Sequence, residues 1–153
     1  MVFLYDTIQG MSAWRRKAIE LLPEQRRLIE TVDTCSYLWT ELGLVFSEAV
    51  QSKNIDVLRR FFAYAKWCWQ DSRSDNAING VLCGFYEHIP DRKNEWWTAA
   101  KFIESSDFGE LESVFRYFLS DEQYKEFAEF YTRERQRHEE GVLVKMRKGK
   151  AVR

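Results

Sequence analysis

The sequence contains few proline, glycine and cysteine residues. Only two of its 153 residues are proline and seven are glycine, which excludes collagen-like repeats and Pro- or Gly-rich linkers. The three cysteines, at positions 35, 68 and 83, are an odd, widely spaced set that fits neither a disulfide framework nor a CxxC zinc site. No apolar run approaches the roughly 20 residues of a membrane span, and no apolar signal segment opens the chain. We therefore expect a cytoplasmic protein with no membrane partner.

Recognisable catalytic motifs are also missing. The chain contains no GxSxG, HExxH, Walker or GxGxxG pattern, and its acids and histidines do not cluster at metal-ligand spacing. The two histidines, His88 and His138, lie at a predicted helix end and in a charged helix. Asp71 and Asp75 are close enough in sequence to hold a cation, but a turn followed by a helix cap is the simpler interpretation. We expect no enzyme activity, no metal and no cofactor, although sequence cannot reveal a carboxylate pair assembled by folding.

Charge is balanced over the whole chain but not along it. The formal net charge is −1, from 23 basic and 24 acidic residues. Residues 142–153 contain five basic residues and no acid, which leaves 18 basic and 24 acidic residues, or −6, in residues 1–141. We expect a flexible basic tail after residue 141. A nucleic-acid or membrane contact is the alternative, and five charges without an aromatic stacking platform do not favour it.

Apolar residues recur at helical spacing along nearly the whole chain, and aromatics make up 16% of it. Asn54 is a good helix cap, either Ser74 or Asp75 starts the next helix, and Ser120 with Gln123 forms a capping-box pattern. The spacing predicts helices over residues 12–22, 34–52, 55–70, 74–89, 93–104, 107–119 and 121–139. We therefore predict an all-α, single compact domain of about six or seven helices over residues 1–141, with residues 1–10 as an N-terminal arm. An irregular HEAT-like stack remains open.

Several aromatic residues lie away from the apolar stripe of their predicted helix. Trp67 points opposite Leu58, Trp96 is adjacent to Trp97, and Tyr117 lies opposite Phe108. Such side chains either contact a second packing layer or stand at the surface as anchors for a protein partner. Phe118, in contrast, is predicted to belong to the buried stripe of the helix over residues 107–119.

The helix predicted over residues 74–89 has small residues on its back. Gly80 and Gly84 each cost about 1 kcal/mol relative to alanine in a helix interior. They indicate either a tight crossing with another helix or a flat surface that receives a partner. The three cysteines lie on or beside apolar stripes and are predicted to fill the core.

The segments over residues 71–78 (DSRSDNAI) and 85–89 (FYEHI) carry a family resemblance. They are similar to a helix in a family of small, all-helical bacterial proteins, mostly uncharacterised, some of which resemble immunity proteins of toxin systems. The resemblance covers about 20 residues closely. It implies a cytoplasmic protein that binds and blocks one toxin, without enzyme activity.

The sequence thus favours a non-catalytic protein that neutralises a bacterial toxin by stoichiometric binding. An acidic body would speed association with a basic partner through long-range electrostatic steering. The alternative is a helical scaffold or self-associating module. The candidate partner-binding residues are Trp67, Asp71, Asp75, Glu87, Trp96, Glu104, Asp107, Glu110, Glu112 and Tyr117.

Overall fold

The computed structural model describes residues 10–151, and every regular element in that range is helical. The predicted all-α fold class is confirmed. The chain forms two compact units, unit 1 (residues 1–86) and unit 2 (residues 87–153). The predicted N-terminal arm lies outside the described residues except for Gly10. No helix in residues 10–151 combines the length and the apolar character that crossing a membrane requires.

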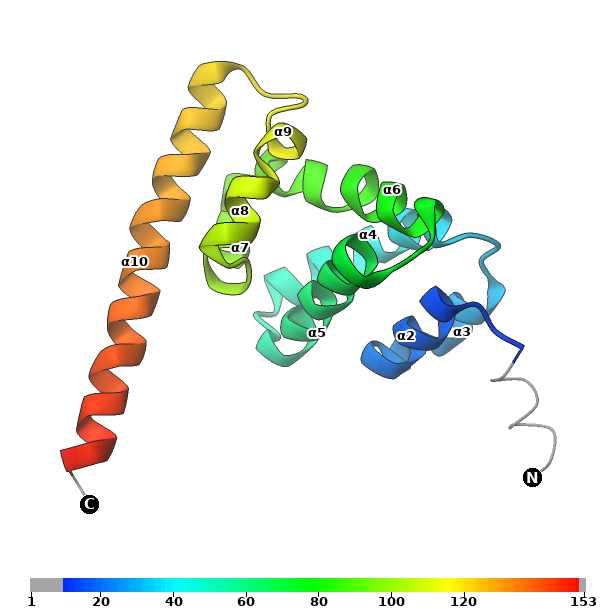
Figure 1. The fold of residues 1–153 in the computed structure, drawn as a ribbon, viewed down its shortest axis with the longest axis horizontal. Coiled ribbons are helices and arrows are strands. Elements are labelled where there is room, and N and C mark those ends of the chain that lie inside the picture. Colours follow the sequence, from blue (N-terminus) through cyan, green and yellow to red (C-terminus); the bar gives the residue numbers. More distant parts are fainter. Residues whose placement is uncertain (1–9, 152–153) are drawn as a thin grey trace. The chain divides into compact units, whose positions relative to one another are not determined.

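Unit 1 contains five α-helices within its described residues. They are α2 (Ala13–Leu21), α3 (Arg26–Thr31), α4 (Cys35–Gln51), α5 (Ile55–Lys66) and α6 (Asp75–Gly84), with a 3₁₀ turn η1 (Pro23–Gln25) before α3 and a π-helical turn η2 (Trp67–Asp71) after α5 (Figure 1). Asn54 and Ser74 each accept a hydrogen bond from the backbone N–H three residues on, at 3.3 Å, so both predicted caps are confirmed. Thr34 caps α4 in the same way.

Trp39 lies at the centre of the aromatic core of unit 1. Its ring stacks on Tyr64 of α5 with 5.2 Å between centroids, and it contacts Phe85 at 5.0 Å and Phe61 at 6.4 Å. All four side chains are buried. This cluster joins α4, α5 and the end of α6 through contacts between residues far apart in sequence.

Helix α6 crosses α4 at close range (Figure 1). A Cβ added at Gly80 would lie 2.7 Å from the Cα of Ser36, and one added at Gly84 would lie 3.0 Å from the Cβ of Trp39. Asn76 accepts a hydrogen bond from the backbone N–H of Ser36 across the same crossing, at 3.0 Å. The predicted tight crossing is confirmed, and it accounts for both glycines.

The cysteine prediction is confirmed for two residues and wrong for the third. Cys35 and Cys68 are buried in unit 1, whereas Cys83 is exposed. Cys83 lies about 200° around α6 from buried Val81. It therefore lies on the side of the helix that faces away from the core.

Unit 2 begins with short 3₁₀ turns and ends with one long helix. The 3₁₀ turns are η3 (Tyr86–Asp91), which begins at the last residue of unit 1, and η4 (Lys93–Glu95). The α-helices are α7 (Trp96–Phe102), α8 (Ser105–Glu110), α9 (Glu112–Phe115) and α10 (Asp121–Ala151) (Figure 1). The predicted capping box is confirmed, since Ser120 Oγ accepts from the Gln123 N–H at 3.2 Å and Gln123 Oε1 accepts from the Ser120 N–H at 2.9 Å.

Three predicted helix boundaries need correction. The helix predicted to reach residue 89 ends at Gly84. The chain continues as the 3₁₀ turn η3, which contains Pro90. The helix predicted over residues 107–119 is broken at Leu111 and stops at Phe115, so it forms α8 and α9. The last helix continues beyond residue 139 to Ala151, because most of residues 140–151 are good helix formers.

The core of unit 2 lies between α7, α8, α9 and the first half of α10. Phe108 stacks on Tyr131 with 3.7 Å between centroids, and Phe115 and Phe127 pack edge to face at 5.4 Å. The hydroxyl of Tyr131 donates to the carbonyl of Ile103 at 2.6 Å, which ties α10 to the end of α7. These contacts hold the segment between α9 and α10 at one end of the unit.

Candidate protein-binding surface

The ten residues predicted to contact a partner are divided between the two units. Unit 1 holds three of them near the end of α5 and the start of α6: Trp67, Asp71 and Asp75. Unit 2 holds the other seven: Glu87, Trp96, Glu104, Asp107, Glu110, Glu112 and Tyr117. Most of the predicted set therefore lies on one compact unit.

Two of these residues, Trp96 and Asp107, are buried, which corrects their assignment as exposed contacts. Trp96 is 6% exposed, its Nε1–H donates to the carbonyl of Pro90 at 2.9 Å, and its ring packs against Phe127 of α10. The neighbouring Trp97 is half-buried. The core of unit 2 thus takes Trp96, because α10 provides a packing surface that the local helical pattern does not reveal.

Trp67 is half-buried and stands at the start of the π-helical turn η2. Its ring lies parallel to that of Tyr64, with 6.3 Å between centroids. Asp71 and Asp75 are exposed. A role for these three residues in partner binding stays a prediction.

Two aromatic side chains project from the turn between α9 and α10. Tyr117 is 72% exposed and Phe118 is 63% exposed, and their rings meet edge to face at 4.9 Å. The turn is closed by backbone hydrogen bonds from Tyr117 to Val114 and from Leu119 to Arg116, and the capping box then starts α10 at once. Both rings therefore stand outside the core of unit 2.

The prediction identified Tyr117 but placed Phe118 in a buried stripe. The helix break at Leu111 and the end of α9 at Phe115 remove Phe118 from that stripe. The ring of Phe118 instead lies nearly parallel to that of His88, with 6.3 Å between centroids. The capping box at Ser120 was the feature of the sequence that could have indicated this exposure. It starts a new helix at Asp121, so the preceding helix has to end before Phe118.

Exposed carboxylates lie at the helix ends on both sides of this turn in the chain. Glu110 ends α8, Glu112 starts α9, and Asp121 and Glu122 start α10. We call this surface the acidic–aromatic end; it comprises Glu110, Glu112, Tyr117, Phe118, Asp121 and Glu122, all exposed.

Arg116 neutralises part of this acidic surface. Its guanidinium forms ion pairs with Asp121 and, at 3.3 Å, with Glu112, and it lies 4.9 Å from the ring centre of Tyr124. The hydrogen bond with Asp121 raises the pKa of Arg116 above its ordinary value. Glu110 and Glu122 make no ion pair with any described residue, so their charge remains available to a partner.

The acidic excess of the chain belongs to unit 2. Residues 1–86 contain ten basic and ten acidic residues, whereas residues 87–141 contain eight basic and 14 acidic residues, a formal charge of −6. The five basic residues of the segment 142–153 bring unit 2 as a whole to −1. The acidic–aromatic end lies within residues 87–141, whose charge of −6 attracts basic molecules.

A shallow recess of about 470 Å³ adjoins Phe118. The apolar part of its lining comes from Pro90, Trp96 and Phe118. Lys93 and Glu126 also line it and form an ion pair at 2.5 Å. The recess can accept an apolar side chain of a partner next to the exposed aromatic pair.

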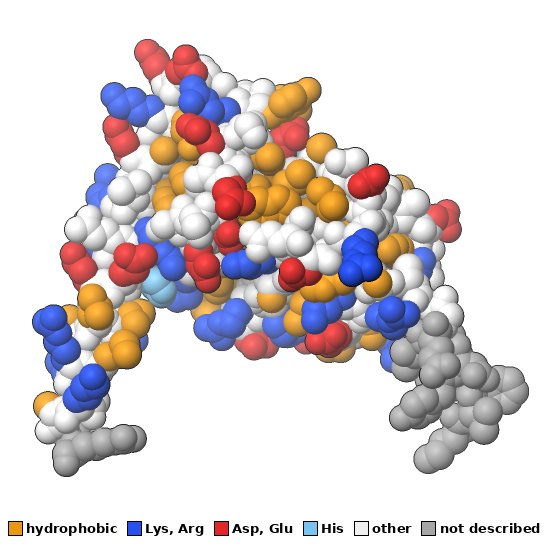
Figure 2. Space-filling model, in the orientation of Figure 1, with side chains coloured by type: hydrophobic (Ala, Val, Ile, Leu, Met, Phe, Trp, Pro, Cys, Tyr) orange, Lys and Arg blue, Asp and Glu red, His pale blue; other side chains and the backbone are white. Residues whose placement is uncertain are grey.

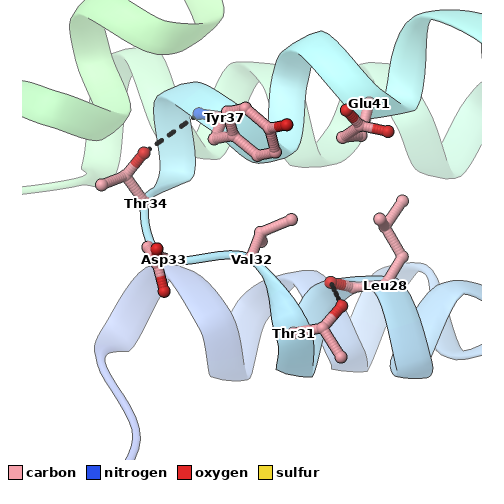
Figure 3. Close-up of a pocket in the computed structure, with 7 residues that line it drawn as sticks. All are labelled: Leu28, Thr31, Val32, Asp33, Thr34, Tyr37 and Glu41. Carbon is pink, nitrogen blue, oxygen red and sulfur yellow. Dashed lines mark hydrogen bonds between the residues drawn. The ribbon is translucent and has the colours of Figure 1, made fainter.

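Unit 1 has a larger groove, of about 610 Å³, between the end of α3 and the first turns of α4. Figure 3 shows Tyr37 and Glu41 of α4 facing Val32 and Leu28 across it. Tyr37 is 56% exposed and lies opposite the buried stripe of α4. The sequence analysis did not identify this groove. Tyr37 and Leu44, seven residues apart on the outer face of α4, were the signal that could have indicated an apolar surface there.

A buried polar cluster in unit 1 has a structural role. The hydroxyl of Tyr64 donates to the carbonyl of Trp14 at 3.0 Å and lies 3.4 Å from the Sγ of Cys35. Burial raises the pKa of Tyr64 and of Cys68 above their ordinary values, so both stay protonated at neutral pH. These groups join α2, α4, α5 and η2, and they present no nucleophile to solvent.

The described residues contain no group of three or more His, Cys, Asp and Glu side chains that could hold a metal ion. The imidazole Nδ1 of His88 lies 2.9 Å from a carboxylate oxygen of Asp91 in the next turn.

Comparisons of the chain with protein-family models, with curated proteins and with solved structures found no match.

Proposed function

We propose that the protein acts by stoichiometric binding of a basic protein partner through the acidic–aromatic end of unit 2. One observation supports this most directly: the two exposed rings of Tyr117 and Phe118 stand within residues 87–141, which carry a formal charge of −6. Exposed aromatic residues are typical interface anchors, and complementary charge brings a partner to them quickly.

The two kinds of side chain have different roles in this proposal. Carboxylates at the rim of an interface mainly set the association rate and its dependence on salt. An aromatic side chain that becomes buried on binding mainly sets the dissociation rate, and its truncation costs about 2 kcal/mol or more if it is a hot spot. The recess beside Phe118 supplies a place for an apolar group of the partner.

The partner in this proposal is a protein toxin, and the chain is its immunity protein in a bacterial cytoplasm. This part rests on the family resemblance of residues 71–78 and 85–89 together with the negative unit 2. Tight and fast neutralisation of a toxin requires both an anchor and electrostatic steering.

The test captures the partner from the cells that produce the protein and measures its binding by surface plasmon resonance. We expect a basic protein that inhibits growth when expressed alone and not when expressed together with this chain. Replacing both rings (Tyr117→Ala with Phe118→Ala) should speed dissociation by about 30-fold or more.

Tyr37→Ala is the matched control, because Tyr37 is a similarly exposed aromatic residue in unit 1. The control should bind as the wild type does. If Tyr37→Ala weakens binding and the double variant does not, the groove of unit 1 is the contact surface and the assignment to unit 2 fails.

A helical scaffold or self-associating module remains the second candidate function. The observation that favours it is the exposed C-terminal end of α10, where apolar and basic side chains alternate.

A further inference from the structure

The last eleven described residues of α10 form an uncovered helical segment, which we call the basic segment (residues 141–151). Every one of them is exposed. Four are large apolar residues with 45–59% exposure, Val142, Leu143, Val144 and Met146, and four are cations, Lys145, Arg147, Lys148 and Lys150. Figure 2 shows these apolar and basic side chains gathered beside one another near the C-terminal end of α10.

The basic segment lacks the tertiary support that the rest of α10 has. Arg135 ties α10 to α7 by donating to the carbonyls of Ala100 and Lys101 at 3.2 and 3.3 Å, whereas every residue of the basic segment is exposed. An isolated helix of this length is only marginally stable in water. Val142, Leu143 and Met146 lie within about 100° of one another around the helix, with Val144 on the other side. A surface that covers these three side chains and pairs with the neighbouring cations would stabilise the segment.

The acidic–aromatic end has the complementary properties. It offers the exposed rings of Tyr117 and Phe118 to apolar side chains, and the carboxylates of Glu110 and Glu122 to cations. The formal charge of residues 87–141 is −6, and residues 142–153 carry five basic residues and no acid. The chain therefore holds both halves of a complementary contact.

The two halves lie at opposite ends of one helix. The acidic–aromatic end includes the first residues of α10, and the basic segment ends at Ala151 (Figure 1). Thirty residues of helix rise about 45 Å. A continuous helix cannot bring its own two ends together, so such a contact requires two molecules.

We infer that the basic segment of one molecule binds the acidic–aromatic end of a second copy of the same chain. The inference uses the surface of the proposed function but needs no other partner. The contact is head to tail, so it leaves one free site of each kind and can extend to larger assemblies. It weakens with salt, since ion pairs between exposed groups are screened.

Sedimentation velocity on the purified full-length protein tests this. At about 50 mM salt we expect the mean mass to rise with protein concentration, and at about 500 mM salt we expect much less association. Neutralising the segment (Lys145→Gln, Arg147→Gln, Lys148→Gln) should leave a monomer. The matched control neutralises three exposed cations of unit 1 (Arg27→Gln, Arg59→Gln, Arg73→Gln) and should still associate.

Mixing two defective variants separates this contact from nonspecific attraction. A variant of the acidic–aromatic end (Glu110→Gln, Tyr117→Ala, Glu122→Gln) keeps its basic segment, and the neutralised-segment variant keeps its acidic–aromatic end. Each should be monomeric alone, and the mixture should form 1:1 dimers and nothing larger. Circular dichroism of each variant checks that the helices remain.

The inference is overturned if the wild-type protein stays monomeric at low salt, or if the mixture stays monomeric while the wild type associates. If the protein stays monomeric in solution but binds vesicles of anionic phospholipid through its basic segment, the segment contacts a lipid surface. That result would also overturn the inference. A monomeric protein that still captures a basic partner would leave the proposed function intact, so the two ideas fail separately.

Discussion

Gly80 lies where α6 packs closely against the backbone of α4. A Cβ at this position would lie 2.7 Å from the Cα of Ser36, which is backbone and cannot rotate away. We predict that Gly80→Ala lowers the free energy of unfolding by about 1–2 kcal/mol, because the strain exceeds the gain in helix propensity. Urea denaturation measures this.

Gly43→Ala is the control for that prediction. Gly43 lies inside α4, and a Cβ there would meet nothing within 4 Å. The substitution should raise the free energy of unfolding by up to about 1 kcal/mol through propensity alone. Equal stabilisation by both substitutions would contradict the close crossing of α4 and α6.

Glu24 gives the protein a pH-dependent ion pair within unit 1. Arg60 donates to both of its carboxylate oxygens, at 2.7 and 2.8 Å, and these hydrogen bonds hold the pKa of Glu24 below its ordinary value of 4.5. A carboxyl group whose pKa is lowered by folding stabilises the folded state above its unfolded pKa, and that stability is lost as the pH falls through the folded pKa.

We therefore predict that Glu24→Gln lowers the free energy of unfolding at pH 7 by less than about 1 kcal/mol, since Glu24 is solvent-exposed. The difference from the wild type should shrink as the pH falls below about 4.5. Thermal denaturation over a pH series measures it. Glu48→Gln, another exposed carboxylate of unit 1, should show no such convergence.

At the scale of elements, α10 combines a packed half with an uncovered half. Phe127 and Tyr131 are buried, whereas residues 139–151 are all exposed. We predict that a chain ending at Glu140 keeps its melting temperature within a few degrees in dilute solution and loses helical signal in proportion to the deleted residues. Circular dichroism measures both. A large fall in melting temperature would mean that the exposed half of α10 contributes to folding.

At the scale of the whole molecule, charge distinguishes residues 87–141 from the rest of the chain. Unit 1 has equal numbers of acids and bases, and residues 87–141 carry a formal charge of −6. We predict that neutralising Glu110 and Glu122 slows association with the captured partner, most strongly at low salt. Stopped-flow binding over a salt series measures this.

Neutralising Asp71 and Asp75 removes the same charge from unit 1 and serves as the control for that prediction. Both are exposed and both were predicted contact residues. If their removal slows association and the removal of Glu110 and Glu122 does not, the partner binds unit 1.

The sequence by itself determined the features that depend on neighbouring residues. Asn54, Ser74 and Ser120 cap helices through hydrogen bonds that span three residues, so a local pattern is enough to predict them. The all-α class follows from apolar spacing in the same way. The glycines of α6 were consistent with a tight crossing or with a flat surface for a partner, and the short distances to Ser36 and Trp39 show the crossing.

Only the tertiary structure decided which surfaces are covered. Trp96 and Tyr117 looked alike in the sequence, yet α10 buries Trp96, and the turn after α9 leaves Tyr117 exposed. Phe118 left its predicted stripe, and the basic segment became an uncovered extension of α10. Burial depends on elements distant in sequence, and helical periodicity describes only one element at a time. For the same reason the acidic–aromatic end appears only once α8, α9 and the start of α10 are folded together.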